Sequence, residues 1–206
     1  FQKIPGTTIV QQPALPHWNQ LAKKGLTDFV GGVTDGRYGA AATDFACVHD
    51  PLKARKGYFF FDKEFVCLRT AIQSKAEYPV VTTVNQCLLN GDVIIQTGSE
   101  RQKPSKGKHA LNDVAWVWHD KVAYIFPEPV DINCNNTTAS GSWRSINHQA
   151  WATNEMVQKD VFCLWFDHGP RPVQAGYAYI VAPAMDVDAA AAYSKKTSIE
   201  ILSNTK

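Results

Sequence analysis

Two acid–histidine pairs are the first residues of this sequence that could do chemistry. Asp167 and His168 end the apolar run 160–169, and His119 and Asp120 follow a second apolar run. An imidazole next to a carboxylate can act as a general base. Both pairs also lie in turn-like contexts, where an aspartate commonly hydrogen-bonds the backbone of its own turn. We therefore expect structural roles for both pairs, and an enzyme that uses Asp167 and His168 is the minor alternative.

The other candidate motifs for catalysis or cofactor binding are incomplete. The six histidines show neither HxH nor HxxxH spacing and have no carboxylate cluster beside them, so we predict no metal site and no cofactor. The run 139–143, ASGSW, lacks one glycine of the Gly-x-Ser-x-Gly nucleophile motif. The glycine-rich run 31–39 lacks the GK[ST] ending of a phosphate loop and is typical of a tightly turning strand. The residues alone thus point to no catalytic set.

Cysteines, asparagines and one basic segment complete the candidate residues. None of the five cysteines forms a CxxC pair, and Cys67 and Cys163 lie in apolar runs, which favours burial. Asn135 and Asn136 fit the N-x-T acceptor pattern, which matters only in a glycosylating host. The loop from Arg101 to Lys108 is basic and could contact an acidic ligand, although a solvated loop is the simpler interpretation.

Composition limits the class of protein. The chain has 206 residues, 21 Lys and Arg against 19 Asp and Glu, and a formal net charge of +2, which argues against a nucleic-acid partner. With 45% hydrophobic and 19% charged residues the composition is globular, and no apolar run is long enough to span a membrane. The chain begins with Phe1 instead of Met, so we expect a segment cut from something longer. Aromatic residues, at 11%, can fill a wide core or stack on sugars.

Short apolar or alternating runs bounded by turn residues predict an all-β protein, a large antiparallel β-sandwich in one domain. The predicted strand regions are 57–68, 79–89, 92–98, 113–126, 160–169, 176–183 and 198–202. Asn90-Gly91 is a strong hairpin signal, and residues 119–121 are a weaker one. The polar run 133–142 is typical of a loop. A short helix is expected within 184–196, with Asp186 or Asp188 near its start.

Eight ordered segments carry a resemblance to a known family. They are 4-IPGTT-8, 29-FVGGVTDGRYGAAATDF-45, 53-KARKGYFFFDKEFVCL-68, 80-VVTTVNQCLLNGDV-93, 141-GSWRSIN-147, 161-VFCLWFDHGPRP-172, 176-GYAYIVAP-183 and 201-ILSNT-205. In this order they resemble the central supersandwich domain of polysaccharide lyase family 8, which is galactose-mutarotase-like in fold. The resemblance extends from Ile4 to Thr205, and the chondroitin AC lyase type is the most similar within the family.

This resemblance implies a parent enzyme that cleaves acidic polysaccharides, such as chondroitin or hyaluronan, by β-elimination at a uronic acid. In the family an α/α toroid precedes the sandwich and a smaller β domain follows it. Both are expected to be absent from residues 1–206, as are the catalytic Asn, His, Tyr and Arg of the toroid. We therefore assign no catalytic residue, and we expect intramolecular contact with the missing toroid and a secreted or periplasmic protein. The alternative is a stand-alone carbohydrate-binding or structural module.

One substrate contact and two departures follow from the same resemblance. Trp18, in 16-PHWNQ-20, is the candidate for the aromatic residue that lines the sugar cleft in chondroitin AC-type members. Its ring could stack on a pyranose or simply pack the loop down. The family usually has Trp where this chain has Tyr58, and Leu-Gly-x-Gly-Ile where it has 68-LRTAI-72. Arg69 at a glycine position predicts a remodelled strand or a member that has diverged from the main lyase group.

Overall fold

The computed structural model describes residues 2–15, 17–20, 22, 24–98, 100–197 and 199–205, with only the backbone of Trp18. The strands are β1 (Thr8–Val10), β2 (Val30–Thr34), β3 (Gly39–Ala46), β4 (Lys53–Phe60), β5 (Phe65–Gln73), β6 (Pro79–Leu88), β7 (Val93–Thr97), β8 (Glu100–Gln102), β9 (Lys108–His119), β10 (Val122–Gly141), β11 (Val157–Pro170) and β12 (Ala175–Pro183). The helical elements are the 3₁₀ turns η1 (Trp18–Gln20) and η2 (Trp143–Ser145) and the α-helix α1 (Val187–Lys195).

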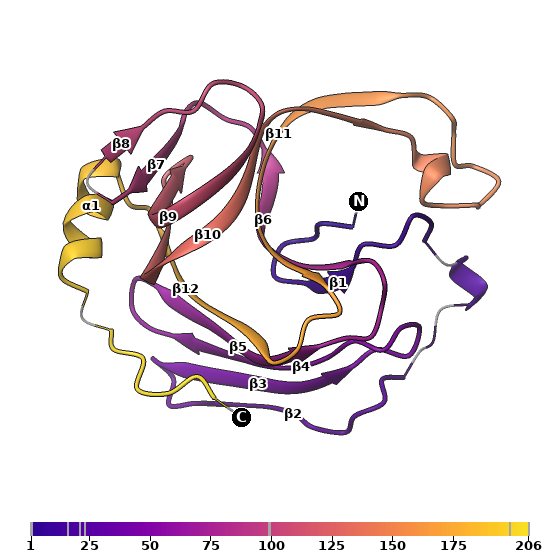
Figure 1. Cartoon of the computed structure of the whole chain (residues 1–206), viewed down its shortest axis with the longest axis horizontal. Coiled ribbons are helices and arrows are strands. Elements are labelled where there is room, and N and C mark those ends of the chain that lie inside the picture. The colour runs from indigo at the N-terminus through magenta and orange to yellow at the C-terminus, as the bar shows by residue number, and fades with distance from the viewer. Residues whose placement is uncertain are drawn as a thin grey trace.

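All strands of the described residues belong to one antiparallel sheet. Its order is β1-β6-β11-β10-β12-β5-β4-β3-β2, and β9, β7 and β8 branch successively from β10. Figure 1 shows β2 to β5 stacked along the lower side of the view and β7 to β10 at the upper left, so the sheet bends over onto itself. This arrangement confirms the predicted all-β fold, a large antiparallel sandwich with few helical residues.

The two faces of the sheet are buried in separate clusters. On β12, Tyr177 and Tyr179 belong to a large inner core, whereas Ile180 and Ala182 belong to a smaller core beneath α1. This division follows from the alternation of side chains along a strand, and it explains why β12 is an almost continuous apolar run. Inner-core aromatic rings stack on one another, with Phe166 and Tyr177 centroids 5.5 Å apart. The two cysteines that the sequence predicts to be buried, Cys67 and Cys163, are both buried.

Helix α1 begins where the sequence predicts. The Asp186 side chain accepts a hydrogen bond from the Ala189 backbone N–H at 2.7 Å, which satisfies one of the free donors of the first turn. The Trp118 indole donates to the Met185 carbonyl at 2.7 Å and ties the start of the helix to β9. Helix α1 therefore covers the outer face of the sheet through small side chains such as the buried Ala190.

The strand predicted at 198–202 is wrong for the residues that the structure describes. Residues 199–202 form no strand. Ile199 and Ile201 instead pack against the core beneath α1, and farther along the Asn204 amide donates to the Tyr177 carbonyl at 3.0 Å. The alternating isoleucines cover the outer face of the sheet without forming a strand. Their sequence pattern is the same as that of a half-buried strand, which explains the wrong prediction.

The two hairpin signals have opposite outcomes. Strands β6 and β7 flank Asn90-Gly91, but β6 pairs with β1 and β11 whereas β7 pairs with β8 and β9, so the hairpin prediction is wrong. Of these two residues only Gly91 has a positive φ, which does not make a type I′ turn. The weaker signal is confirmed, because Asp120 and Lys121 both have positive φ and join the paired strands β9 and β10.

Two further segments differ from the sequence expectation. The region 57–68 contains a turn, closed by the Phe61 N–H bond to the Glu64 carbonyl at 2.9 Å, between β4 and β5. The polar run 133–142 is not a loop, because residues 133–141 form the second half of β10 and pair with β11. Polarity misled the prediction because Asn135 and Asn136 are buried through hydrogen bonds, and only residues 138–140 of this run are exposed.

Strand β5 has a bulge next to Arg69, the position where the family pattern has a glycine. The pairing register of β5 shifts near this point with both β4 and β12, and Ala71 has a φ of 54°. A Cβ on Gly176, opposite in β12, would lie 2.8 Å from the Arg69 carbonyl oxygen. The bulge therefore brings the two backbones so close that residue 176 must be glycine.

Candidate functional site

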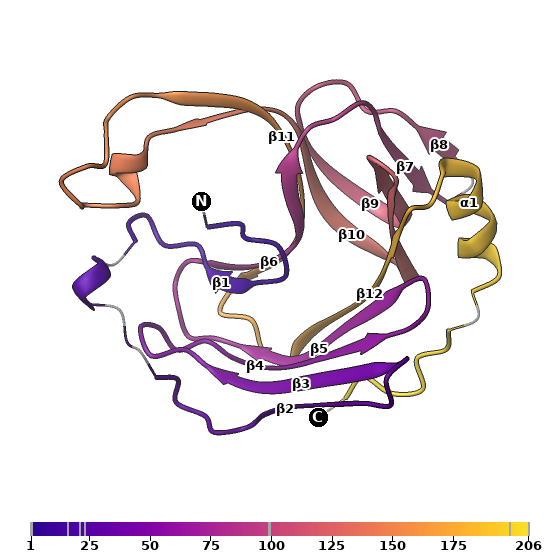
Figure 2. The ribbon, with the colours of Figure 1, turned by 180° about the vertical axis from the view of Figure 1, so that it is seen from behind.

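One part of the molecule projects from the sandwich, and we call it the arm. It comprises residues 137–141 of β10, residues 157–161 of β11 and the connection 142–156 between them. Figures 1 and 2 show the arm extending over the chain's N-terminal end in both views. Five consecutive residue pairs, from Thr137 with Val161 to Gly141 with Val157, hold its strands together. The arm is therefore a regular two-stranded ladder, which can hold its connection in a defined place.

Backbone and arginine contacts order the connection at the end of the arm. The Arg144 N–H donates to the Thr153 carbonyl at 3.0 Å, and its guanidinium donates to the Gln149 carbonyl at 3.0 Å. The ring centroids of His17 and His148 lie 5.0 Å apart, so the connection contacts the residue directly before η1. The backbone of Trp18 lies in η1, but its side chain is outside the described residues. A sugar contact by Trp18 thus stays a prediction.

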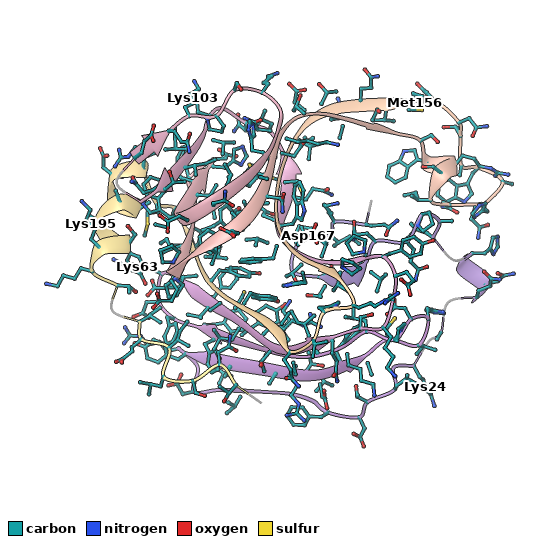
Figure 3. The ribbon with its side chains drawn as sticks, viewed as in Figure 1. Lys24, Lys63, Lys103, Met156, Asp167 and Lys195 are labelled. Carbon is teal, nitrogen blue, oxygen red and sulfur yellow. The ribbon has the colours of Figure 1, made fainter. Side chains whose placement is uncertain are left out.

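The arm carries exposed aromatic and apolar side chains that sequence reasoning did not assign. Trp143 is 53% exposed and Trp151 is 70% exposed. Met156, marked in Figure 3, is exposed at the same end of the molecule. A sequence signal existed, because tryptophans in a polar stretch between strands have no core to fill, and ligand-binding residues are common on such connections.

A hollow of about 360 Å³ lies along the arm next to Trp143. It is lined largely by apolar side chains of β6, β10 and β11, among them Leu88, Val157 and Val161. Lys159 contributes a cationic side chain to the same hollow. An apolar surface with an indole suits the CH-rich face of a sugar ring, and an ammonium suits a carboxylate or sulfate.

Asp167 and His168 have structural partners. The Asp167 carboxylate accepts the Gly169 backbone N–H at 2.9 Å, which is the turn-capping role expected from sequence. His168 Nε2 lies 2.8 Å from the Thr82 hydroxyl. Burial, and after it the charge of Arg69, lowers the pKa of His168 to about 4, so the ring is neutral near pH 7. Asp167, labelled in Figure 3, lies well away from the arm connection marked by Met156.

His119 and Asp120 also hold the fold together. His119 is buried, its ring stacks on Phe162 with centroids 4.4 Å apart, and its Nε2 accepts the Asn90 backbone N–H at 3.1 Å. Asp120 accepts the Asn90 side-chain amide at 3.0 Å. Burial lowers the pKa of His119, which favours the neutral acceptor form that the Asn90 bond requires. This pair therefore fixes the chain between β6 and β7.

Most cations of the basic segment 101–108 are paired with the protein's own carboxylates. Arg101 contacts Asp188 at 3.0 Å, Lys103 contacts Asp92 at 2.7 Å, and Lys106 contacts Asp160 at 2.6 Å. Residues 100–102 are strand β8, so only part of the segment is a loop. These pairings favour the simpler interpretation of a solvated surface over a ligand site.

The two N-x-T asparagines are used inside the fold. Asn135 and Asn136 are both buried, and the Asn135 amide donates to the Val161 carbonyl at 2.9 Å. Asn136 accepts the Gly107 backbone N–H at 2.8 Å. A glycan on either side chain would have to be accommodated at a buried position. Among the described residues no group of three or more His, Cys, Asp or Glu could hold a metal ion. In the same residues no helix is long and apolar enough to cross a membrane.

Comparisons with known proteins match this chain over all or most of its length. The family profile described as "Polysaccharide lyase family 8, super-sandwich domain" matches residues 1–194. Chondroitinase-AC of Pedobacter heparinus is 38% identical over 212 residues, which cover 100% of this chain and 29% of the relative. A hyaluronate lyase of Thermasporomyces composti is 28% identical, with 88% of this chain and 23% of the relative covered.

A solved structure of a chondroitinase AC lyase superimposes with a TM-score of 0.86 at 38% identity, covering 100% of this chain and 30% of that one. The chain thus spans less than a third of the length of these relatives.

Proposed function

Because the chain belongs to polysaccharide lyase family 8, as its super-sandwich domain, we propose that it forms the sandwich domain of an acidic-polysaccharide lyase. The substrate class is a uronic-acid-containing polymer of the chondroitin or hyaluronan kind, after the relatives' names. In such a β-elimination a base removes the C5 proton of the uronic acid. The electron pair forms the C4–C5 double bond as the C4–O bond breaks, and the leaving oxygen takes up a proton.

Residues outside these 206 supply the catalytic groups under this proposal. The observation that carries it is the arm, where the exposed Trp143 and the cationic Lys159 line one hollow and Trp151 is exposed on the connection. Both acid–histidine pairs, in contrast, are engaged in turns and core contacts. The chain thus supplies a wall for the polysaccharide and a rigid support for an N-terminal α/α toroid, with a smaller β domain on its C-terminal side. A large polymeric substrate is met outside the cell, so the proposed location is secreted or periplasmic.

The experiment is to incubate the chain with chondroitin and with hyaluronan and to follow the ultraviolet absorbance of the unsaturated uronate product. The proposal expects no product from the chain alone. Steady product formation would place catalytic groups within residues 1–206 and would overturn that part of the proposal. If product formed, His168→Ala would test whether the Asp167–His168 pair is responsible.

The exposed tryptophans also favour a second candidate, a stand-alone carbohydrate-binding module without lyase activity. The two candidates predict different coding sequences on either side of this chain in its gene. A lyase requires several hundred upstream codons with a helical pattern. A start codon and signal peptide directly before Phe1 would instead favour the module. Cell fractionation with an antibody to the chain tests the proposed location, and a cytoplasmic protein would contradict it.

A further inference from the structure

Strands β4 and β5 place two cations side by side inside the sandwich. Lys56 and Arg69 are direct partners in the pairing register of these strands. Lys56 is 7% exposed and Arg69 is 4% exposed. Tyr58 and Cys67, each two residues along the same strands, pack with the inner core. Since alternate residues of a strand share a face, both cations point to the interior of the fold.

No carboxylate of the described residues neutralises this pair, because none of their ion pairs involves Lys56 or Arg69. The Lys56 ammonium donates to the Gly6 carbonyl and lies 4.5 Å from the Tyr58 ring centroid. The Arg69 guanidinium lies 5.5 Å from the Phe45 ring centroid. Aromatic faces offset part of the cost of burying a cation, but they leave two like charges close together in a region of low dielectric.

Two hydrogen-bond donors in this cluster are buried without a partner. Arg69 Nε and the Tyr177 hydroxyl have no hydrogen-bond partner in the described protein. They are neighbours, because Arg69 of β5 and Tyr177 of β12 are direct partners in the pairing register of these strands. An unpaired buried donor is costly, and more so when it is charged, so each such group calls for a partner such as a water molecule or an ion.

The surrounding titratable groups do not neutralise the charges of Lys56 and Arg69. The groups near Lys56 and Arg69 are the phenols of Tyr58, Tyr177 and Tyr179 and the thiol of Cys67, which burial keeps protonated by raising the pKa of each. His168 is close enough to Arg69 for that charge to lower its pKa, and it adds no negative charge. The interior therefore contains positive charge and free donors but no anion of its own.

We propose that the Lys56–Arg69 pair binds a small monovalent inorganic anion, a halide such as chloride, inside the sandwich. A halide accepts hydrogen bonds from several directions at once, so one ion can take up both the free Arg69 Nε–H and the Tyr177 hydroxyl while it offsets the second positive charge. The flexible side chain of Lys56 can turn from the Gly6 carbonyl toward the ion. The bound anion stabilises the contact between β4 and β5 and stands apart from the arm.

The test measures the thermal midpoint of the chain while sodium chloride replaces sodium gluconate at constant ionic strength. A ligand at about twentyfold over its dissociation constant raises the midpoint of a domain of this size by about 4–7 °C. The proposal expects such a saturating rise in the wild type and its loss in Arg69→Met and in Lys56→Met. Arg55→Met is the matched control, because Arg55 is an exposed cation of the same strand and should keep the full chloride response.

A second measurement locates the ion and does not depend on any variant folding. Crystals of the chain grown in sodium bromide should show an anomalous peak in contact with Arg69 Nε and the Tyr177 hydroxyl. A wild-type midpoint that is the same in chloride and gluconate would overturn the proposal. So would bromide peaks confined to the surface, or an Arg69→Met protein that keeps the wild-type response. None of these outcomes bears on polysaccharide binding, so the two proposals fail separately.

Discussion

The strand β10 passes through two regions with opposite chemistry. Its first residues, such as Tyr124 and Ile125, are buried and pair with β9 and β12 in the body of the sandwich. Its last residues, 137–141, enter the arm, where Trp143 and Trp151 at the far end are exposed. The difference teaches that one continuous strand can serve two purposes. The body supplies stability, and the arm presents a surface.

The largest expected contrast between the two regions is in stability. Phe162 is fully buried and stacks on His119, so Phe162→Ala should lower the free energy of unfolding by about 3–5 kcal/mol. Trp151→Ala in the arm should change it by no more than about 0.5 kcal/mol. Denaturant unfolding of both variants measures the contrast. Equal losses would mean that the arm belongs to the same cooperative core as the body.

The next contrast is a pH dependence that should belong to the body. The pKa of His168 is about 4 in the folded chain against an ordinary value of 6.5, because of burial and Arg69. Between these two values the unfolded chain binds more protons, so the free energy of unfolding should fall as the pH drops from 6.5 to 4. The expected loss from this group is on the order of 3 kcal/mol, with no further loss below pH 4.

His168→Gln removes the titrating ring and should flatten this part of the stability curve. Denaturant unfolding at several pH values and a fixed chloride concentration measures both proteins. His148→Gln, at the end of the arm, is the matched control and should keep the wild-type slope. An unchanged slope in His168→Gln would show that other groups cause the acid sensitivity of the body.

A smaller effect is expected where α1 closes the outer face of the body. Asp186→Ala removes the acceptor for the Ala189 N–H and should cost about 1 kcal/mol of stability. Asp186→Asn keeps an oxygen acceptor at the same place and should cost little. Thermal unfolding compares the two variants. If both were equally destabilised, the charge of Asp186 would matter more than its hydrogen bond.

The sequence was most informative in the body. Runs such as 176–183 are apolar at nearly every position because both faces of β12 are buried, and the start of α1 is marked by an aspartate cap. The family resemblance extended the prediction of the fold to the whole sandwich. The hairpin at Asn90-Gly91 failed because pairing depends on distant strands, and local turn propensity does not contain that information.

The sequence was least informative in the arm and in the interior cation pair. Residues 133–141 are mostly polar, because Asn135 and Asn136 are buried through hydrogen bonds and the following residues enter the arm, so their pattern resembles a loop although they pair with β11. Trp143 and Trp151 have the same residue type as the buried Trp116, and only the fold separates exposed from buried indoles. A lysine and an arginine in a sequence are ordinarily interpreted as surface residues. The burial of Lys56 and Arg69 depends on the register of β4 with β5, which the sequence does not show.

The most direct test of the division between body and arm is retention on immobilised chondroitin. The chain carrying both Trp143→Ala and Trp151→Ala should fold normally and bind about tenfold more weakly, the change that a loss of about 1.4 kcal/mol produces. Phe59→Ala, which removes an exposed ring from the outer face of β4, should bind as the wild type does. Unchanged retention of the arm variant, or an equal loss in Phe59→Ala, would contradict the account.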